Sequence, residues 1–153
     1  MVRIEQHRTF GVSPERGFAY ITDTANWPAY WPDLIDVEAG RWEQPGDRAR
    51  VVLRLLGRRT DLDLTLRRFE PPRLVAYDSS QRGLPDVRHE RLFEAAGEGL
   101  DYGIVVEYEP RGGVAGVLDR TLVRRAAERA VRRTLDNLER ELASLVEREP
   151  PPG

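Results

Sequence analysis

The feature that most constrains the fold is a long amphipathic segment from Val114 to Val146. Its apolar residues recur every three or four positions, a spacing that predicts one α-helix of about nine turns with a single apolar face. These residues are Leu118, Leu122, Ala126, Ala130, Val131, Leu135, Leu138, Leu142, Leu145 and Val146. A helix of this kind is stable only when its apolar face packs against another layer. The preceding residues must therefore build that layer.

Most of the preceding chain alternates apolar and polar residues with a period of two, which is typical of half-buried β-strands. The strands are predicted at residues 2–12, 34–43, 50–56, 61–68, 74–80, 87–95 and 100–109. Short turns join the strands after the first, which favours antiparallel pairing. Ser13 and Pro14 have the residue types of a helix N-cap and first turn, and predict a short helix through Ile21. A second short helix or tight turns are expected at 23–32, where two prolines interrupt the chain.

These elements predict an α+β fold in which a curved, seven-stranded antiparallel sheet wraps around the C-terminal helix, with two short helices after the first strand. We expect one domain over residues 1–149 and a proline-rich disordered tail at 150–153. A curved sheet that wraps a single helix leaves a space between the two layers. The sequence therefore predicts an internal cavity.

Composition excludes several classes of function. The net charge of −2 provides no general attraction to nucleic acid, and no nucleic-acid partner is expected. The chain has no cysteine, which excludes disulfides, thiolate catalysis and cysteine-bound metals. His7 and His89 are far apart in sequence and lack metal-ligand spacing, so we expect neither a metal site nor a cofactor. No apolar segment is typical of a signal peptide or a membrane span, which favours a cytoplasmic protein.

Five short segments occur in a characteristic order and spacing. They are Phe10-x-Val12-x-Pro14-Glu15-x-x-Phe18, Asp23-x-x-x-Trp27-Pro28-x-x-Trp31-Pro32, Glu94-Ala-Ala-Gly-Glu-Gly-Leu100, Val106-Glu-Tyr-Glu-Pro110 and Arg133-Thr-Leu-Asp-Asn-Leu-Glu139. Their order resembles the START/Bet v 1-like superfamily, and in particular the small bacterial SRPBCC proteins called polyketide cyclase/dehydrase-like. The resemblance implies the helix-grip fold and a pocket for an apolar molecule such as a lipid, quinone, sterol or polyketide. It does not imply an enzyme, because the superfamily includes both carriers and cyclases.

Residues on the predicted inner faces of the strands and helices are the candidates for ligand contact. The candidates are Trp27, Tyr30, Trp31, Leu53, Leu55, Leu64, Leu66, Arg68, His89, Tyr102, Ile104, Ala126 and Ala130. Trp27, Tyr30 and Trp31 form either a plug in the core or the wall of an apolar cavity. The small side chains of Ala126 and Ala130 allow either close packing on the sheet or room for a ligand.

Arg68 is the first candidate for a catalytic role. It closes the apolar face of the strand at 61–68, and strict alternation directs its side chain toward the cavity. There it could hold a carboxylate, carbonyl or enolate oxygen by charged hydrogen bonds. The alternative is a side chain that turns to water and pairs with a neighbouring glutamate. Aromatic polyketide cyclases use cavity arginines with a tyrosine to position a poly-β-keto chain, and the resemblance implies Arg68 for one such arginine.

His89 and Tyr30 are the other catalytic candidates. If strand parity turns Phe93 inward, His89 and Arg91 face the cavity with it, where a histidine could transfer protons near neutral pH. A solvated or structural role for His89 is the alternative. Tyr30 or Tyr77 would take the place of the cyclase tyrosine that the resemblance implies.

Three functions remain open from the sequence. The first is binding of a small hydrophobic molecule such as a lipid, quinone or polyketide. The second is a polyketide aromatase/cyclase-type enzyme that uses cavity arginine, tyrosine and histidine. The third is an interaction module whose cavity is filled by its own side chains. This module would use the basic face of the long helix to meet an acidic partner or a membrane surface. That face carries Arg120, Arg124, Arg125, Arg129, Arg132 and Arg133. An edge strand or the exposed helix could also support a homodimer.

Overall fold

The computed structural model describes residues 1–55, 57–82, 85–110 and 113–148, with only the backbone described at 113–120 and 148. Its strands are β1 (Val2–Phe10), β2 (Leu34–Ala39), β3 (Arg48–Leu55), β4 (Arg58–Glu70), β5 (Leu74–Ser80), β6 (Val87–Ala96) and β7 (Gly99–Tyr108). Its helices are α1 (Pro14–Thr22), the 3-10 turn η1 (Thr24–Asn26), α2 (Trp27–Tyr30) and α3 (Gly113–Arg148). The strands form one seven-stranded antiparallel sheet in the order β1-β7-β6-β5-β4-β3-β2. The predicted α+β architecture is confirmed.

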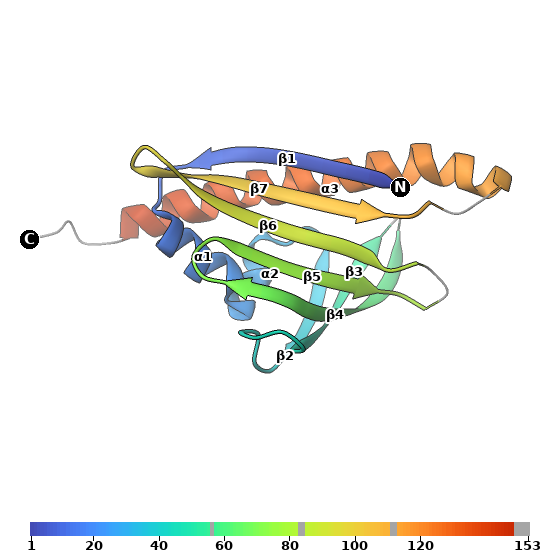
Figure 1. The fold of residues 1–153 in the computed structure, drawn as a ribbon, viewed down its shortest axis with the longest axis horizontal. Coiled ribbons are helices and arrows are strands. Elements are labelled where there is room, and N and C mark those ends of the chain that lie inside the picture. Colours follow the sequence, from blue (N-terminus) through green and yellow to red (C-terminus); the bar gives the residue numbers. More distant parts are fainter. Residues whose placement is uncertain (56, 83–84, 111–112, 149–153) are drawn as a thin grey trace, which may run out of the picture.

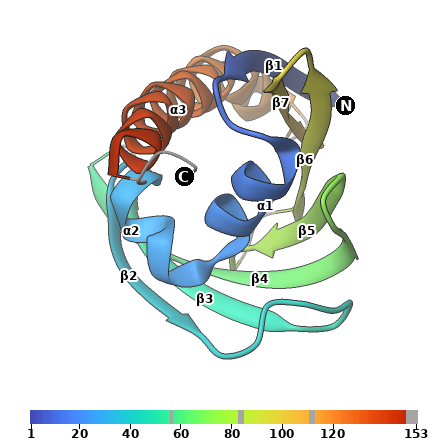
Figure 2. The same ribbon diagram turned by 90° about the vertical axis from the view of Figure 1, so that its left-hand side faces the viewer.

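Helix α3 lies along the concave side of the curved sheet (Figure 1). In the view along the helix, the sheet forms an open ring, α3 lies across the gap between the edge strands β1 and β2, and α1 lies inside the ring (Figure 2). The helix contacts β1 on one side and α2 on the other. Among its described side chains, the buried ones are Val131, Leu135, Leu138 and Leu142. The apolar face of the helix therefore closes the sheet, which is the helix-grip arrangement.

Two residues toward the ends of the described apolar face of α3 are less buried than the periodicity predicts, and Leu118 lies outside the described side chains. Leu122 is 59% exposed and Val146 is 42% exposed. The 36-residue helix spans about 54 Å, whereas a ten-residue strand spans about 33 Å. The helix is therefore longer than the sheet that it closes, and its ends have less to pack against.

The first two helices follow local sequence signals. The Ser13 hydroxyl accepts a hydrogen bond from the Arg16 amide at 3.2 Å, and Pro14 begins α1, so the predicted N-cap is confirmed. The Ile21 carbonyl near the end of α1 accepts two hydrogen bonds, from Trp27 Nε1 at 3.1 Å and from the Tyr30 hydroxyl at 2.7 Å. These two bonds fix the aromatic side chains of α2 against the end of α1.

An irregularity in β4 overturns one sequence prediction. Leu66 pairs with Tyr77 but Arg68 pairs with Ala76, so Arg67 is an extra residue at a β-bulge. Both Arg67 and Arg68 are exposed on the outer face of the sheet, and Phe69 returns to the core. The prediction that Arg68 faces the cavity is wrong, because the bulge reverses the alternation on which it rested.

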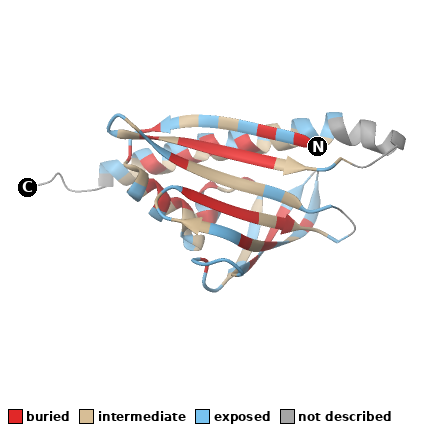
Figure 3. Cartoon of the chain, in the orientation of Figure 1, coloured by how far each residue is buried: buried red, intermediate tan, exposed pale blue. Residues whose placement is uncertain are grey.

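The alternation holds at the edge of the sheet, where β1 is buried along one face and more exposed along the other (Figure 3). Among the described residues, no helix is long and apolar enough to cross a membrane. The predicted boundary between the domain and the tail, at residues 149–150, lies outside the described residues.

Candidate functional site

An internal cavity of about 600 Å³ lies between the sheet and α3. Its wall is mostly apolar and comes from the end of α1, from α2 and α3, from the β2–β3 connection and from the inner faces of β3 to β7. The apolar residues of the wall are Ile21, Trp27, Trp31, Trp42, Leu53, Leu55, Leu62, Val75, Val87, Ile104, Val106, Val123, Ala127, Ala130 and Val131. Some wall residues are themselves exposed to solvent, namely Leu55, Arg58, Pro85 and Glu109. The cavity therefore reaches the surface where these strand ends meet α3.

The opposite end of the space between sheet and helix is filled by packed aromatic side chains. The Tyr102 ring lies 5.9 Å from the Phe10 ring and 5.1 Å from the Phe93 ring, and Phe18 lies 4.9 Å from Phe93. Tyr102, Leu64 and Leu66 are no more than 1% exposed and do not line the cavity. These three predicted ligand contacts lie on the inner face, as expected, but inside the packed core.

The other predicted contacts are distributed as follows. Those that line the cavity are Trp27, Tyr30, Trp31, Leu53, Leu55, His89, Ile104 and Ala130. Ala126 does not line it, whereas Ala127 does. The lining residues of α3 run from Val123 through Ala127 and Ala130 to Thr134, which is the three-and-four spacing of one helix face. Ala126 lies beside this line rather than on it.

One polar part of the wall is a cluster on the paired strands β5 and β6, which we call the β5–β6 polar cluster: Tyr77, Ser79, His89 and Arg91. Tyr77 is directly opposite His89, and their rings stack with centroids 4.5 Å apart and an interplanar angle of 9°. Arg91 Nη2 donates a hydrogen bond to the Tyr77 hydroxyl at 2.9 Å. Ser79 Oγ and His89 Nε2 are hydrogen-bonded at 2.9 Å. All four side chains line the cavity.

The electrostatics of this cluster are unusual for a buried site. Burial, together with the positive charge of Arg91, lowers the pKa of His89 well below its usual value, so this imidazole is neutral at pH 7. Among the described residues, His89 Nδ1 is buried and has no hydrogen-bond partner. Burial raises the pKa of the Tyr77 hydroxyl, although Arg91 opposes that shift. The cluster therefore presents a charged guanidinium and a neutral imidazole.

Of the three catalytic candidates from the sequence, only His89 lines the cavity with a side-chain nitrogen, Nδ1, that has no partner among the described residues, and this nitrogen is itself buried. The Tyr30 hydroxyl is occupied by the Ile21 carbonyl, and burial raises its pKa well above the usual value. Arg68 lies on the outer face, where its Nε donates to a Glu70 carboxylate oxygen at 2.7 Å. This pairing matches the alternative that the sequence left open for Arg68.

The ligand contacts predicted from the sequence do not include the main partners of His89. Strand parity predicts that Arg91 faces the cavity, and Arg91 lines its wall. Tyr77 and Ser79 alternate in sequence with the polar residues Asp78 and Ser80, which are half-buried, and this alternation is a signal that could have placed Tyr77 and Ser79 on the inner face. Their contact with His89 and Arg91 depends on the register between β5 and β6, which no local pattern displays.

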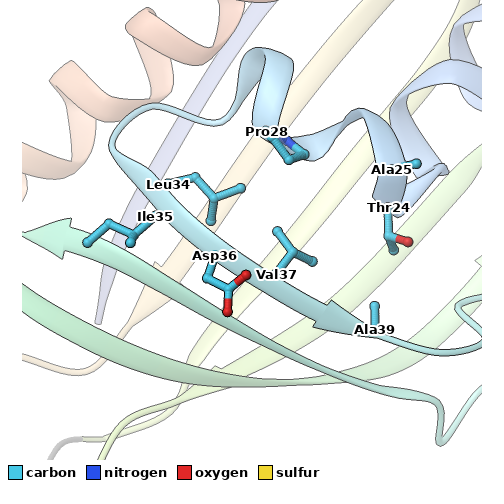
Figure 4. Close-up of a pocket in the computed structure, with 8 residues that line it drawn as sticks. All are labelled: Thr24, Ala25, Pro28, Leu34, Ile35, Asp36, Val37 and Ala39. Carbon is cyan, nitrogen blue, oxygen red and sulfur yellow. The ribbon is translucent and has the colours of Figure 1, made fainter.

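A second, shallower pocket of about 310 Å³ lies on the surface between η1, α2 and the edge strand β2. Figure 4 shows its eight lining residues, in which Pro28 faces Leu34 and Val37 across the groove. Asp36 is its one ionisable residue. The pocket therefore has fewer polar groups that could bind or react with a ligand than the internal cavity has.

Among the described residues, no group of three or more histidine, cysteine, aspartate or glutamate side chains is arranged to hold a metal ion.

Comparison with known proteins agrees with the fold. Residues 1–143 match the family described as polyketide cyclase / dehydrase and lipid transport. The chain belongs to this family. A comparison with curated proteins found no match.

Solved structures with this fold come from several bacteria. TTHA0849 from Thermus thermophilus superposes with a TM-score of 0.81 at 19% identity, covering 94% of this chain and 99% of that one. The Zhui aromatase/cyclase from Streptomyces sp. R1128 gives 0.82 at 16% identity, covering 95% of each chain. A START superfamily protein from Mycobacterium smegmatis gives 0.75 at 10% identity, covering 94% and 98%. At these identities the likeness establishes the shared fold, and the chemistry must be argued from the residues of this family member.

Those residues support binding more directly than catalysis. A cavity with apolar walls removes the hydrocarbon surface of a ligand from water, and a few polar groups then orient it. Ser79 is hydrogen-bonded to His89, but His89 Nδ1 lacks, among the described residues, the carboxylate that orients a histidine in a hydrolytic triad. Arg91 could stabilise negative charge on an oxygen in the cavity.

Proposed function

We propose that this protein binds a small, largely hydrophobic molecule in the cavity between the sheet and α3. The observation that carries the proposal is the cavity itself, about 600 Å³ in volume with mainly apolar walls and contact with the surface. Ligand sites for small molecules commonly have volumes of roughly 300–1,000 Å³ and similar walls. The family description, which includes lipid transport, supports the same function.

The direct test is binding of N-phenyl-1-naphthylamine, an uncharged aromatic probe that fluoresces in apolar surroundings. Trp27, Trp31 and Trp42 line the cavity, so the probe should also quench tryptophan emission. Ala130→Phe should weaken binding about tenfold or more, because the added ring occupies space that the probe needs. Fluorescence titration measures both effects.

The matched control is Ala143→Phe, which adds the same ring to an exposed position of α3 outside the cavity. This variant should bind the probe as the unaltered protein does. Equal binding by both variants would contradict the proposal, as would an unaltered protein that does not bind the probe at all. Circular dichroism establishes that each variant is folded.

A polyketide cyclase-like activity is the second candidate. It is favoured by Arg91 and Tyr77, which bring a cation and a hydroxyl 2.9 Å apart to the cavity wall and could polarise a substrate carbonyl. If this function is correct, Arg91→Met should lower turnover of a poly-β-keto substrate by about a hundredfold or more. Arg68→Met should leave turnover unchanged, because Arg68 lies on the outer face. Product analysis by chromatography measures both rates, and equal rates would contradict the assignment.

The third function suggested by the sequence is less well supported. It requires a cavity filled by the protein's own side chains, and a cavity is present. Two arginines of the basic helix face are paired within the protein. Arg124 Nε donates to a Glu128 carboxylate oxygen at 2.9 Å, and Arg133 Nη1 donates to Asp33 at 2.8 Å. A role for this face in binding a membrane or an acidic partner stays a prediction.

A further inference from the structure

Arg91 places a positive charge in a mostly apolar wall. Its two hydrogen bonds go to uncharged oxygens, the Tyr77 hydroxyl at 2.9 Å and the Glu90 carbonyl at 3.2 Å. Among the side chains that the structure describes, no carboxylate lies within 4.0 Å of its nitrogens. A guanidinium has five N–H donors, so these two bonds leave donors available. A charge withdrawn from water without a counter-ion is costly, so a ligand that neutralises it would gain affinity.

The outer face of the same sheet provides a contrast. Its arginines pair with carboxylates, as in Arg67 with Asp78 at 2.7 Å and Arg50 with Asp63 at 3.3 Å. Arg68 is paired with Glu70 in the same way. These exposed arginines have acidic partners, although water already solvates their charge. The inward-facing Arg91 has no acidic partner among the described residues. This difference indicates that the counter-ion of Arg91 comes from outside the chain.

His89 adds a second, directional group beside this charge. Stacking on Tyr77 fixes the plane of its ring, and Ser79 holds Nε2 at 2.9 Å. Nδ1 is then left without a partner in the described part of the chain. When the Ser79 hydroxyl donates to Nε2, the neutral imidazole carries its hydrogen on Nδ1 and can donate it. An ionised oxygen is the acceptor that both this N–H and the guanidinium prefer.

We propose that the β5–β6 polar cluster is a subsite for one ionised oxygen group, so that the ligand is an apolar molecule carrying a single negative charge, such as a carboxylate or an acidic phenolate. This inference rests on the proposed binding function. Arg91 neutralises the charge, and His89 donates a hydrogen bond from Nδ1, which is buried in this structure and reaches the ligand once the imidazole shifts toward it. The apolar part of the ligand packs on neighbours of the cluster such as Trp42, whose ring lies 5.9 Å from that of Tyr77. A neutral carbonyl would accept the same hydrogen bonds but would leave the charge of Arg91 unpaired.

The test compares two competitors of nearly equal shape, 2-naphthoate and 2-acetylnaphthalene, which differ by one negative charge at neutral pH. Each is titrated against bound N-phenyl-1-naphthylamine. Arg91→Met should weaken 2-naphthoate binding about tenfold or more and should change ketone binding less than about threefold. Arg68→Met removes an arginine from the outer face and should change neither. Equal effects of Arg91→Met on both competitors would overturn the proposal.

His89→Phe is a second variant that keeps a ring to stack on Tyr77 and removes Nδ1. It should weaken 2-naphthoate binding about threefold to tenfold and leave ketone binding almost unchanged. In the unaltered protein, ¹⁵N spectra of the imidazole should show hydrogen on Nδ1 when 2-naphthoate is bound. Hydrogen on Nε2 in that complex would contradict the proposed donor, whether or not either variant folds.

The outcomes separate the two proposals. If N-phenyl-1-naphthylamine does not bind, the proposed binding function fails. If the probe binds but 2-naphthoate does not displace it, the cavity binds apolar molecules and the anionic subsite is wrong. The same conclusion follows if Arg68→Met reduces 2-naphthoate binding as much as Arg91→Met does, because the effect would then come from the total charge of the protein.

Discussion

Replacing Leu138 with alanine should lower the free energy of unfolding by about 2–5 kcal/mol. The Leu138 side chain is fully buried in the main core, in the part of α3 that follows the last cavity-lining residue, Thr134. Truncation there removes apolar burial and leaves a void in a region that is already well packed. Urea denaturation followed by circular dichroism measures the loss.

The control for this experiment is Leu122→Ala on the same helix. Leu122 is 59% exposed, so its truncation should change the free energy of unfolding by no more than about 0.5 kcal/mol. Similar losses at the two positions would contradict the difference in burial between Leu138 and Leu122. No change at Leu138 would contradict the packing of the helix against the sheet.

The two histidines of the chain should titrate on opposite sides of the ordinary histidine pKa of about 6.5. His7 is on the outer face, where Nε2 contacts a Glu5 carboxylate oxygen at 2.7 Å and Nδ1 contacts Asp101 at 3.3 Å. The hydrogen bond to Glu5 is the main reason that the pKa of His7 is raised. The pKa of His89 is lowered well below the ordinary value by burial and by Arg91. Because there are only these two imidazoles, NMR titration separates them directly.

The two histidines change the free energy of unfolding with pH in opposite directions. Below pH of about 6.5, the unfolded chain protonates His89 while the folded protein keeps it neutral, so this group lowers the free energy of unfolding as pH falls. His7 stabilises the fold while protonated, and its contribution is lost as pH rises through its raised folded-state pKa. His89→Phe should therefore reduce the acid sensitivity of unfolding. Arg91→Met should raise the pKa of His89 and leave that of His7 unchanged, and a joint shift of both would contradict this assignment.

Local patterns were sufficient for most of the secondary structure. The alternation of Leu62, Leu64 and Leu66 predicted β4, and the Ser13-Pro14 signal predicted the start of α1. Each of these signals involves residues that are close in sequence, so no knowledge of the partner strand was needed. Trp42 shows the limit of such patterns. Alternation predicts a strand through residue 43 that includes Trp42. In the structure β2 ends at Ala39, and Trp42 is buried at the cavity wall.

The sequence by itself determined the α+β class, the antiparallel sheet and the amphipathic helix that closes it, because hydrophobic periodicity and turn chemistry are local properties. Only the tertiary structure decided that Arg68 lies outside the cavity and that Arg91 contacts Tyr77 at its wall. A bulge between β4 and β5 turns Arg68 outward, while the register of β5 with β6 brings Arg91 and His89 beside Tyr77. Strand pairing sets both outcomes. Pairing depends on contacts between residues distant in sequence, so a one-residue shift moves a side chain from water to the cavity without leaving a local signal.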